Sequence, residues 1–212
     1  MSYFPLFVNL TDRKCLVVGG GSVAVRKVRM LLDFGARVSV VSKDISNELL
    51  LLSQNSEKIF ISQREFHEED ILEMFLVIAA TNDNSLNRQI SQLCKTRNIQ
   101  VNVVDKLDEC SFILPAYVKE KNVVAAFSSG GNSPVLTQYL KAKAKEYITE
   151  EIGEINECLG SVRKEIQNIF PTEAIRKEVF ETILQYALSD NSIPTEKEIE
   201  IIISQIKKKY EI

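Results

Sequence analysis

The sequence is poor in histidine, tryptophan and cysteine. Its 212 residues include one histidine, no tryptophan and four cysteines, which are scattered without a Cys-x-x-Cys pair. This spacing argues against a disulfide framework and against a zinc site, so we expect no metal held by the protein. The single histidine, His67, lies in a charged stretch at 65–70 that indicates a surface loop. We therefore do not expect a histidine general base.

Strong charge and long apolar runs are also missing. The formal net charge of −3 gives no general attraction to nucleic acid or to an anionic membrane surface. No apolar stretch reaches the roughly 18–20 residues that a spanning helix needs. The first five residues lack the basic region and apolar core of a signal peptide. We expect a cytoplasmic protein with no nucleic-acid or membrane partner.

A glycine-rich turn is the most informative feature that is present. An apolar run at 15–18 leads directly into Gly-x-Gly-x-x-Ala, with glycines at Gly19 and Gly21 and the alanine at Ala24. Gly19 permits a tight turn, Gly21 lets the backbone approach a phosphate, and Ala24 lets the following helix pack closely on the sheet. The helix N-terminus adds about half a positive charge facing the anion. This pattern predicts a dinucleotide-binding turn.

Strand and helix patterns then alternate through the first half of the chain. This alternation predicts an α/β fold, a Rossmann-like doubly wound parallel sheet with its ligand crevice at the C-terminal ends of the strands. The expected strands are 14–18, 37–41, 59–62, 76–80 and 100–104, and the expected helices run from the glycine turn to residue 34 with Gly35 as the stop, around 49–52, and over 85–97 with Asn82, Asp83 or Asn84 as the cap.

The pattern changes after residue 110. Two strands at 111–118 and 122–128, separated by a polar turn at 119–121, indicate a hairpin or an exchanged pair. A second glycine-rich loop at 128–134 follows, with Pro134 placed as a first helical residue. Its residues Ser129, Gly130, Gly131 and Asn132 either bind an anion at a helix start or simply connect strand to helix.

The remaining chain has a wholly helical pattern. Breaks are expected at Pro171 and at 189–191, and Pro194 is expected to start the last helix. These amphipathic helices indicate a helical cap or a dimer-forming element. The predicted domains are a dinucleotide-binding domain at 1–110, a dimerisation segment at 111–148 and a helical domain at 149–212.

Polar residues follow three of the predicted strands at the same edge of the sheet. Thr81 and Asn82, with Asp83, either contact the nicotinamide or its ribose or cap the next helix. Asp105 ends the fifth strand and is either a turn-former or a proton acceptor. Lys43 and Asp44 follow the second strand, at the place where an acidic residue would favour NAD and a basic residue would favour NADP. Because one residue of each kind is present, this spacing leaves the choice between NAD and NADP open.

Several of these segments together resemble the siroheme synthase N-terminal family, the precorrin-2 dehydrogenases. The similarity covers about residues 3–145 and is carried by motifs at 5–10, 13–21, 23–27, 79–83, 102–105, 111–116 and 128–136. The resemblance implies NAD-dependent oxidation of precorrin-2 to sirohydrochlorin, with insertion of ferrous iron as a further step in some members. It also implies a homodimer whose interface lies at about 111–148. In this chain iron would arrive as a substrate.

The resemblance also implies roles for single residues. Ser22 and Val23 would contact the cofactor phosphates, Lys43 and Asp44 would lie near the adenosine end, Asp105 would be the catalytic aspartate, and the loop of Ser129 would border the tetrapyrrole. Precorrin-2 carries several carboxylates, and a cleft with helix N-termini and basic side chains suits such an anion. A non-catalytic NAD-sensing module remains the alternative from another class, although it would need neither Asp105 nor the second glycine loop. A structural dimer scaffold leaves both loops unexplained.

Overall fold

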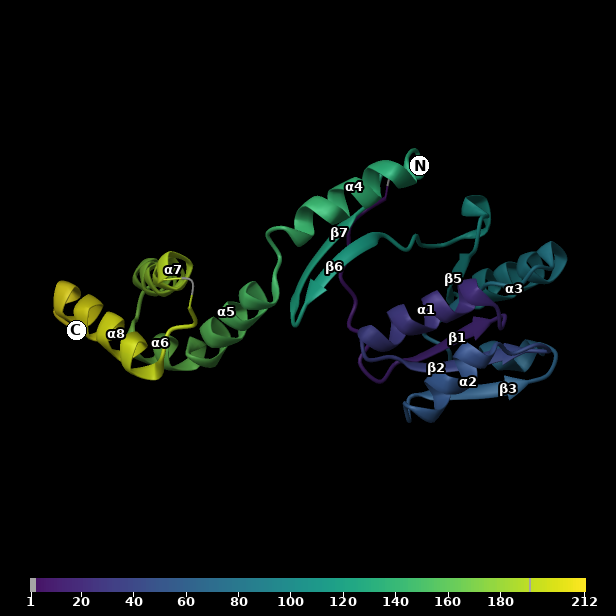
Figure 1. The fold of residues 1–212 in the computed structure, drawn as a ribbon, viewed down its shortest axis with the longest axis horizontal. Coiled ribbons are helices and arrows are strands. Elements are labelled where there is room, and N and C mark those ends of the chain that lie inside the picture. The colour runs from purple at the N-terminus through teal and green to yellow at the C-terminus, as the bar shows by residue number, and fades with distance from the viewer. Residues whose placement is uncertain (1–2, 191) are drawn as a thin grey trace. The chain divides into compact units, whose positions relative to one another are not determined.

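The computed structural model describes residues 3–190 and 192–212. The chain forms two compact units that divide between Leu114 and Pro115 (Figure 1). Each unit has its own apolar core: two buried clusters lie on opposite faces of a sheet in the first unit, and one lies among helices in the second. The predicted three-part division at residues 110 and 148 stays a prediction.

The first unit is built on a five-stranded parallel sheet. Its strand order is β3-β2-β1-β4-β5, so the chain starts in the middle, moves to one edge and then crosses to the other. This is the doubly wound α/β arrangement that the sequence predicted, and the fold class is confirmed. The strands are β1 (Lys14–Val18), β2 (Arg37–Ser42), β3 (Ile59–Gln63), β4 (Leu76–Ala79) and β5 (Gln100–Val103).

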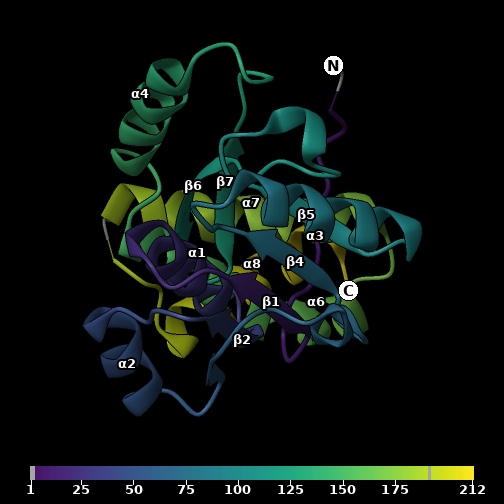
Figure 2. The ribbon, with the colours of Figure 1, turned by 90° about the vertical axis from the view of Figure 1, so that its right-hand side faces the viewer.

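Helices cover both faces of this sheet (Figure 2). Alternate side chains of β1 point to opposite faces: Cys15 and Val17 pack with α1 (Ser22–Asp33) and α2 (Asn47–Gln54). Leu16 and Val18 pack with α3 (Asn84–Thr96) on the other face. Burial on both faces explains why β1 and β4 read as continuous apolar runs instead of alternating ones.

The charged stretch around His67 is more ordered than the predicted surface loop. It contains a 3-10 turn, η1 (Glu68–Ile71), and a second one, η2 (Leu107–Glu109), follows β5. The carboxylate of Asp70 accepts hydrogen bonds from the His67 N–H at 2.9 Å and from Arg64 at 2.6 Å, which fixes the turn. His67 itself is exposed, as expected.

The second unit begins with an antiparallel hairpin of β6 (Ala116–Glu120) and β7 (Val123–Phe127). The prediction was wrong in placing the first strand at 111–118 and the turn at 119–121. Ser111 instead bonds to β5, with its N–H donating to the Val101 carbonyl at 2.8 Å, and Pro115 has no N–H to donate to a ladder. Lys119 and Glu120 belong to the strand, so the turn is shorter than predicted.

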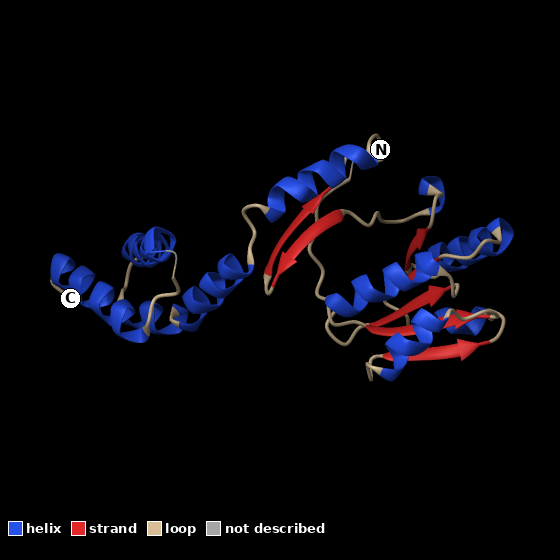
Figure 3. Cartoon of the chain, viewed as in Figure 1, coloured by secondary structure: helices blue, strands red, loops and turns tan. Residues whose placement is uncertain are grey.

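Beyond Pro134 the described residues form helices alone, as predicted (Figure 3). Pro134 is the first residue of its helix and Pro171 lies in a break, both as expected. Ser189 and Asp190 were wrongly predicted as a break, because they continue a helix; Asn191 lies outside the described residues. Pro194 precedes the last helix instead of starting it, since Thr195 forms the cap with Glu198. The helices are α4 (Pro134–Lys145), α5 (Glu150–Ser161), α6 (Arg163–Ile169), α7 (Glu173–Asp190) and α8 (Glu196–Tyr210).

Candidate functional site

The candidate site lies between β1 and β4, where the order in which the chain adds strands to the sheet reverses. These neighbouring parallel strands send their following segments to opposite faces, and their C-terminal ends therefore leave a crevice between the loops. Gly19 follows β1, Thr81 follows β4 and Asp105 follows β5, so all three lie at one edge of the sheet.

Gly19 is required by the close approach of these loops. Its φ is +126°, a conformation that side chains rarely adopt, and a Cβ built there would lie 2.3 Å from the carbonyl oxygen of Ala80. The Ala80 N–H in turn donates to the Val18 carbonyl at 2.8 Å. The predicted turn-forming role of Gly19 thus has a direct steric cause.

Gly20 is equally constrained, and sequence reasoning gave it no role. A Cβ on Gly20 would lie 1.9 Å from the carbonyl oxygen of Asp44, and the Gly20 carbonyl accepts the Ser46 N–H at 3.0 Å. The glycine turn is therefore in backbone contact with the loop after β2. The sequence did contain a clue to this role, because Gly20 is a glycine between Gly19 and Gly21 at a position where the motif does not require one.

Gly21 differs from both, because nothing lies within 4 Å of the position of its Cβ. It is the N-cap of α1, with an ordinary φ of −87°, and it is exposed together with Ser22. Among the described residues no side chain caps this helix end, and its first turn holds no acidic residue. The arrangement leaves space and backbone N–H groups for an anion. A dinucleotide pyrophosphate fits this end of α1.

Lys43 and Asp44 are exposed in the loop after β2. The ammonium of Lys43 forms an ion pair with Glu65 at 2.7 Å, and this contact raises the pKa of Lys43. The Lys43 carbonyl accepts a hydrogen bond from Gln63 at 3.1 Å. The one basic side chain predicted at the adenosine end is therefore already paired with an acid.

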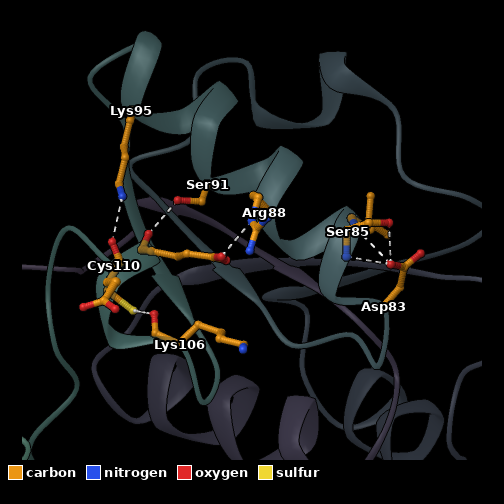
Figure 4. Close-up of polar contacts among 10 residues, drawn as sticks. Asp83, Ser85, Arg88, Ser91, Lys95, Lys106 and Cys110 are labelled. Carbon is orange, nitrogen blue, oxygen red and sulfur yellow. Dashed lines mark hydrogen bonds and ion pairs between the residues drawn. The ribbon is translucent and has the colours of Figure 1, made fainter.

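Asp83 caps α3, as one of the two interpretations of this segment proposed. Its Oδ1 accepts the N–H groups of Ser85 at 2.8 Å and Leu86 at 3.2 Å (Figure 4). The Ser85 hydroxyl also donates to this carboxylate, and these bonds lower the pKa of Asp83. Asn82 takes no part in the cap and is exposed.

Thr81 is held in place by Asn87, which is 2% exposed on the inner face of α3. The Asn87 amide donates to the Thr81 carbonyl at 3.0 Å, and the Thr81 hydroxyl donates to the amide oxygen at 2.7 Å. Sequence reasoning missed Asn87, although an amide among the apolar residues of an amphipathic helix was a usable signal. This pair fixes the loop after β4 beside the glycine turn.

Asp105 lies in a left-handed turn after β5, with a φ of +60°. It is therefore a turn-former, as one interpretation held, and its side chain is exposed; its role as a proton acceptor stays a prediction. Lys27, half-buried on α1, is a neighbour that sequence reasoning missed as a site residue. Burial lowers the pKa of Lys27, and the negative charge of Asp105 acts in the opposite direction. The signal was a lysine on the helix that starts at the glycine turn.

The second glycine loop belongs to the second unit. Gly130 and Gly131 have φ values of +64° and +90°, and the Ser133 hydroxyl caps α4 by accepting the Leu136 N–H at 3.1 Å. The Ser129 hydroxyl bonds within the loop to the backbone of Ser133. Asn132 is exposed. A crevice with this loop on the wall opposite Asp105 stays a prediction.

Among residues 3–190 and 192–212, no group of three or more His, Cys, Asp or Glu side chains is arranged to hold a metal ion. In the same residues, no helix combines the length and apolar character that crossing a bilayer demands.

Comparisons with known proteins connect this geometry to one group of enzymes. Residues 6–116 match a protein family described as "Putative NAD(P)-binding". The siroheme synthase of Nitrosospira multiformis is 42% identical over 188 residues, covering 87% of this chain and 40% of that enzyme. The siroheme synthase of Neisseria meningitidis serogroup C is 39% identical over 181 residues, covering 85% and 38%. The chain thus spans about two fifths of the length of these relatives.

A solved structure shares the fold over nearly the whole chain. The protein described as "SirC, precorrin-2 dehydrogenase" superposes with a TM-score of 0.70 at 24% identity, covering 97% of this chain and 100% of that one. The expected resemblance to siroheme synthases and the prediction of a nicotinamide dinucleotide cofactor are confirmed. On the match over residues 6–116, this chain belongs to the NAD(P)-binding family, in a stretch that it shares with the siroheme synthases.

Proposed function

We propose that this chain oxidises precorrin-2 to sirohydrochlorin, with NAD as the hydride acceptor. The observation that carries the proposal is the position of Asp105, which follows β5 at the same edge of the sheet where the glycine turn follows β1. The names of the relatives, siroheme synthase and precorrin-2 dehydrogenase, support the substrate class. A carboxylate beside a nicotinamide suits a dehydrogenation, because removal of a hydride leaves a proton to be taken.

The residues of the first unit divide the work of cofactor binding. Gly19 and Gly21 shape the turn, and the backbone of Ser22 and Val23 at the start of α1 receives the phosphates. Thr81 and Asn82 face the nicotinamide end, while Lys43 and Asp44 lie toward the adenosine. When bound, the nicotinamide supplies the hydride acceptor. Asp105 accepts the proton, a contribution of about 10²–10⁴-fold to the rate.

The loop of the second unit is proposed to bind the substrate. Ser129, Gly130, Gly131 and Asn132 open α4, whose N-terminus favours an anion such as a substrate carboxylate. The first turn of α4 holds no acidic residue that would oppose a carboxylate.

The proposal is tested by mixing the purified chain with precorrin-2 and NAD and following NADH absorbance. Asp105→Ala is expected to lower kcat by about 10²–10⁴-fold. Asp108→Ala is the matched control, since this exposed carboxylate lies in the same loop. A flat trace for folded wild-type protein that still binds NAD would favour the NAD-sensing module instead.

Insertion of ferrous iron into sirohydrochlorin is a second candidate activity. The support is the name siroheme synthase, carried by relatives that match this chain over 85–87% of its length. Iron would be a substrate, and Asp105 would accept protons from the pyrrole nitrogens. Siroheme formation from sirohydrochlorin and ferrous iron measures this step without NAD.

We also propose a cytoplasmic homodimer. The outer surface of α4 supports the dimer, because Val135 is 80% exposed and Tyr139 57% exposed, and apolar side chains gathered in this way favour an interface. Sedimentation of wild type and of Val135→Asp tests it: the wild type should be dimeric and the variant should dissociate. A monomeric wild type would refute the dimer.

A further inference from the structure

The loop that carries Asp105 is tied to β5 by the side chain of Cys110. The Cys110 Sγ accepts the Val103 N–H at 3.1 Å and lies 3.3 Å from the carbonyl oxygens of both Val103 and Lys106. These two carbonyls lie on either side of Asp105 in the sequence. The thiol therefore lies against the turn and contacts its start and its end. Figure 4 shows the contact with Lys106.

The far end of the same loop is tied to α3. The hydroxyl of Ser91, only 2% exposed, donates to the Glu109 carbonyl at 2.6 Å. Arg88 donates to the Glu109 carboxylate at 3.1 Å, and Lys95 donates to the Asp108 carbonyl at 3.3 Å (Figure 4). Three side chains of α3 thus form hydrogen bonds with η2.

The carboxylate of Asp105 has no such restraint. Within the part of the chain that the structure describes, it forms no hydrogen bond and no ion pair within 4.0 Å. Its φ of +60° belongs to the left-handed conformation, which is unfavourable for a non-glycine residue. The direction of the carboxylate is therefore set by the backbone turn, and the turn is held by its contacts with Cys110.

We propose that Cys110 is a positioning residue for Asp105, with Ser91 holding the far end of the same loop. This inference rests on the proposed function, since it assigns a role in that reaction. Burial raises the pKa of the Cys110 thiol, which keeps it protonated and able to donate to a carbonyl while it accepts from the Val103 N–H. The Cys110 Sγ contacts the backbone on either side of Asp105 and accepts the Asn102 amide N–H at 3.6 Å, but it forms no hydrogen bond with the Asp105 carboxylate, so it takes no part in proton transfer.

The experiment compares Cys110→Ala with Cys110→Ser in the precorrin-2 and NAD assay. Serine keeps a donor and an acceptor at this position, whereas alanine keeps neither and is otherwise similar in size. Because misplacing a reacting group by about 1 Å can cost 10²-fold, we expect alanine to lower kcat by about ten- to a hundredfold. Serine should recover most of the loss, and KM for NAD should be unchanged in both variants.

Two controls separate positioning from loss of folding. Cys158→Ala removes a half-buried thiol in the second unit and should leave kcat unchanged. Ser91→Ala should lower kcat in the same sense as Cys110→Ala, whereas Thr96→Ala should not, because the Thr96 hydroxyl bonds only to its own helix at the Gln92 carbonyl. Rates are taken well below the melting temperature of every variant.

A double variant gives the sharpest outcome. If Cys110 acts through Asp105, adding Cys110→Ala to Asp105→Ala lowers the residual rate no further. Equal rates for the alanine and serine variants, a loss carried by KM for NAD, or a full further loss in the double variant would each overturn the inference. An inactive wild type would instead refute the proposed function, so the two failures are distinguishable.

Discussion

Replacing Gly21 with alanine should separate cofactor binding from folding. The added methyl group would project into open space, with no atom within 4 Å, and the backbone angles of φ −87° and ψ −174° are accessible to alanine. The same space is where we propose that the pyrophosphate approaches the backbone of α1. The methyl group should therefore disturb the ligand and leave the fold intact.

The magnitudes follow from opposing terms. Alanine is a poorer N-cap than glycine by about 0.5–1 kcal/mol. It also restricts the unfolded chain, which stabilises the fold by about 0.4–1 kcal/mol. These terms nearly cancel, so the free energy of unfolding should change little. A lost hydrogen bond to a charged group costs about 1.5–3 kcal/mol, and about 1.4 kcal/mol corresponds to tenfold in Kd. NAD should therefore bind roughly ten- to a hundredfold more weakly.

Titration calorimetry with NAD and urea unfolding of the apo protein measure the two quantities separately. Gly20→Ala is the opposite control: its Cβ would meet the Asp44 carbonyl at 1.9 Å, so one backbone segment must move and stability should fall. If Gly21→Ala bound NAD as tightly as the wild type, the phosphates would not lie against this turn, and our account of the site would be wrong.

Three further outcomes are expected. Glu65→Gln should strengthen NADP binding at low salt without changing NAD binding, because it releases Lys43 from its 2.7 Å ion pair. If the ratio of the two Kd values did not change, Lys43 would not lie near the adenosine ribose of the cofactor. Burial lowers the pKa of Lys27 below 10.5, so the folded state binds fewer protons just below that pH and stability rises with pH there. Lys27→Met should accordingly raise the urea midpoint at neutral pH, by an amount that shrinks as the pH approaches 10.5. The hydrogen bond from Tyr186, with those from Thr195, lowers the pKa of Glu198 from 4.5 to about 2. The stability that this carboxylate contributes above pH 4.5 is therefore lost as the pH falls through about 2. Glu198→Gln should reduce this loss of stability in acid unfolding curves.

Local sequence patterns predicted the first unit closely. The strand Lys14–Val18 was predicted with its observed bounds, because a short apolar run followed by glycines has few alternatives. Gly35, with a φ of +78°, follows the C-cap of α1 and stops the helix as predicted, since only glycine adopts that angle without strain. Periodicity, glycines and caps are all contained within a few residues, which is why these predictions hold.

Contacts between distant residues could not be predicted in this way. Residues 111–115 have the composition of a strand, but Ser111 bonds to Val101, which is ten positions away. The contacts of Ser91 with Glu109 and of Asn87 with Thr81 depend on how α3 packs on the sheet. The predicted strand pattern indicated Asp105 and the family resemblance implied its catalytic role, whereas the side chains that hold its loop became visible only in the folded chain.

The contact between Gly20 and Asp44 has a consequence for redesign of cofactor choice. The loop that would discriminate the two dinucleotides shares a backbone boundary with the phosphate-binding turn, and the Gly20 carbonyl also receives the Ser46 N–H at 3.0 Å. Exchanging side chains at Lys43 or Asp44 leaves that boundary intact, whereas inserting or deleting a residue there would shift the turn as well. Specificity in this chain should therefore change readily by substitution and poorly by altering loop length.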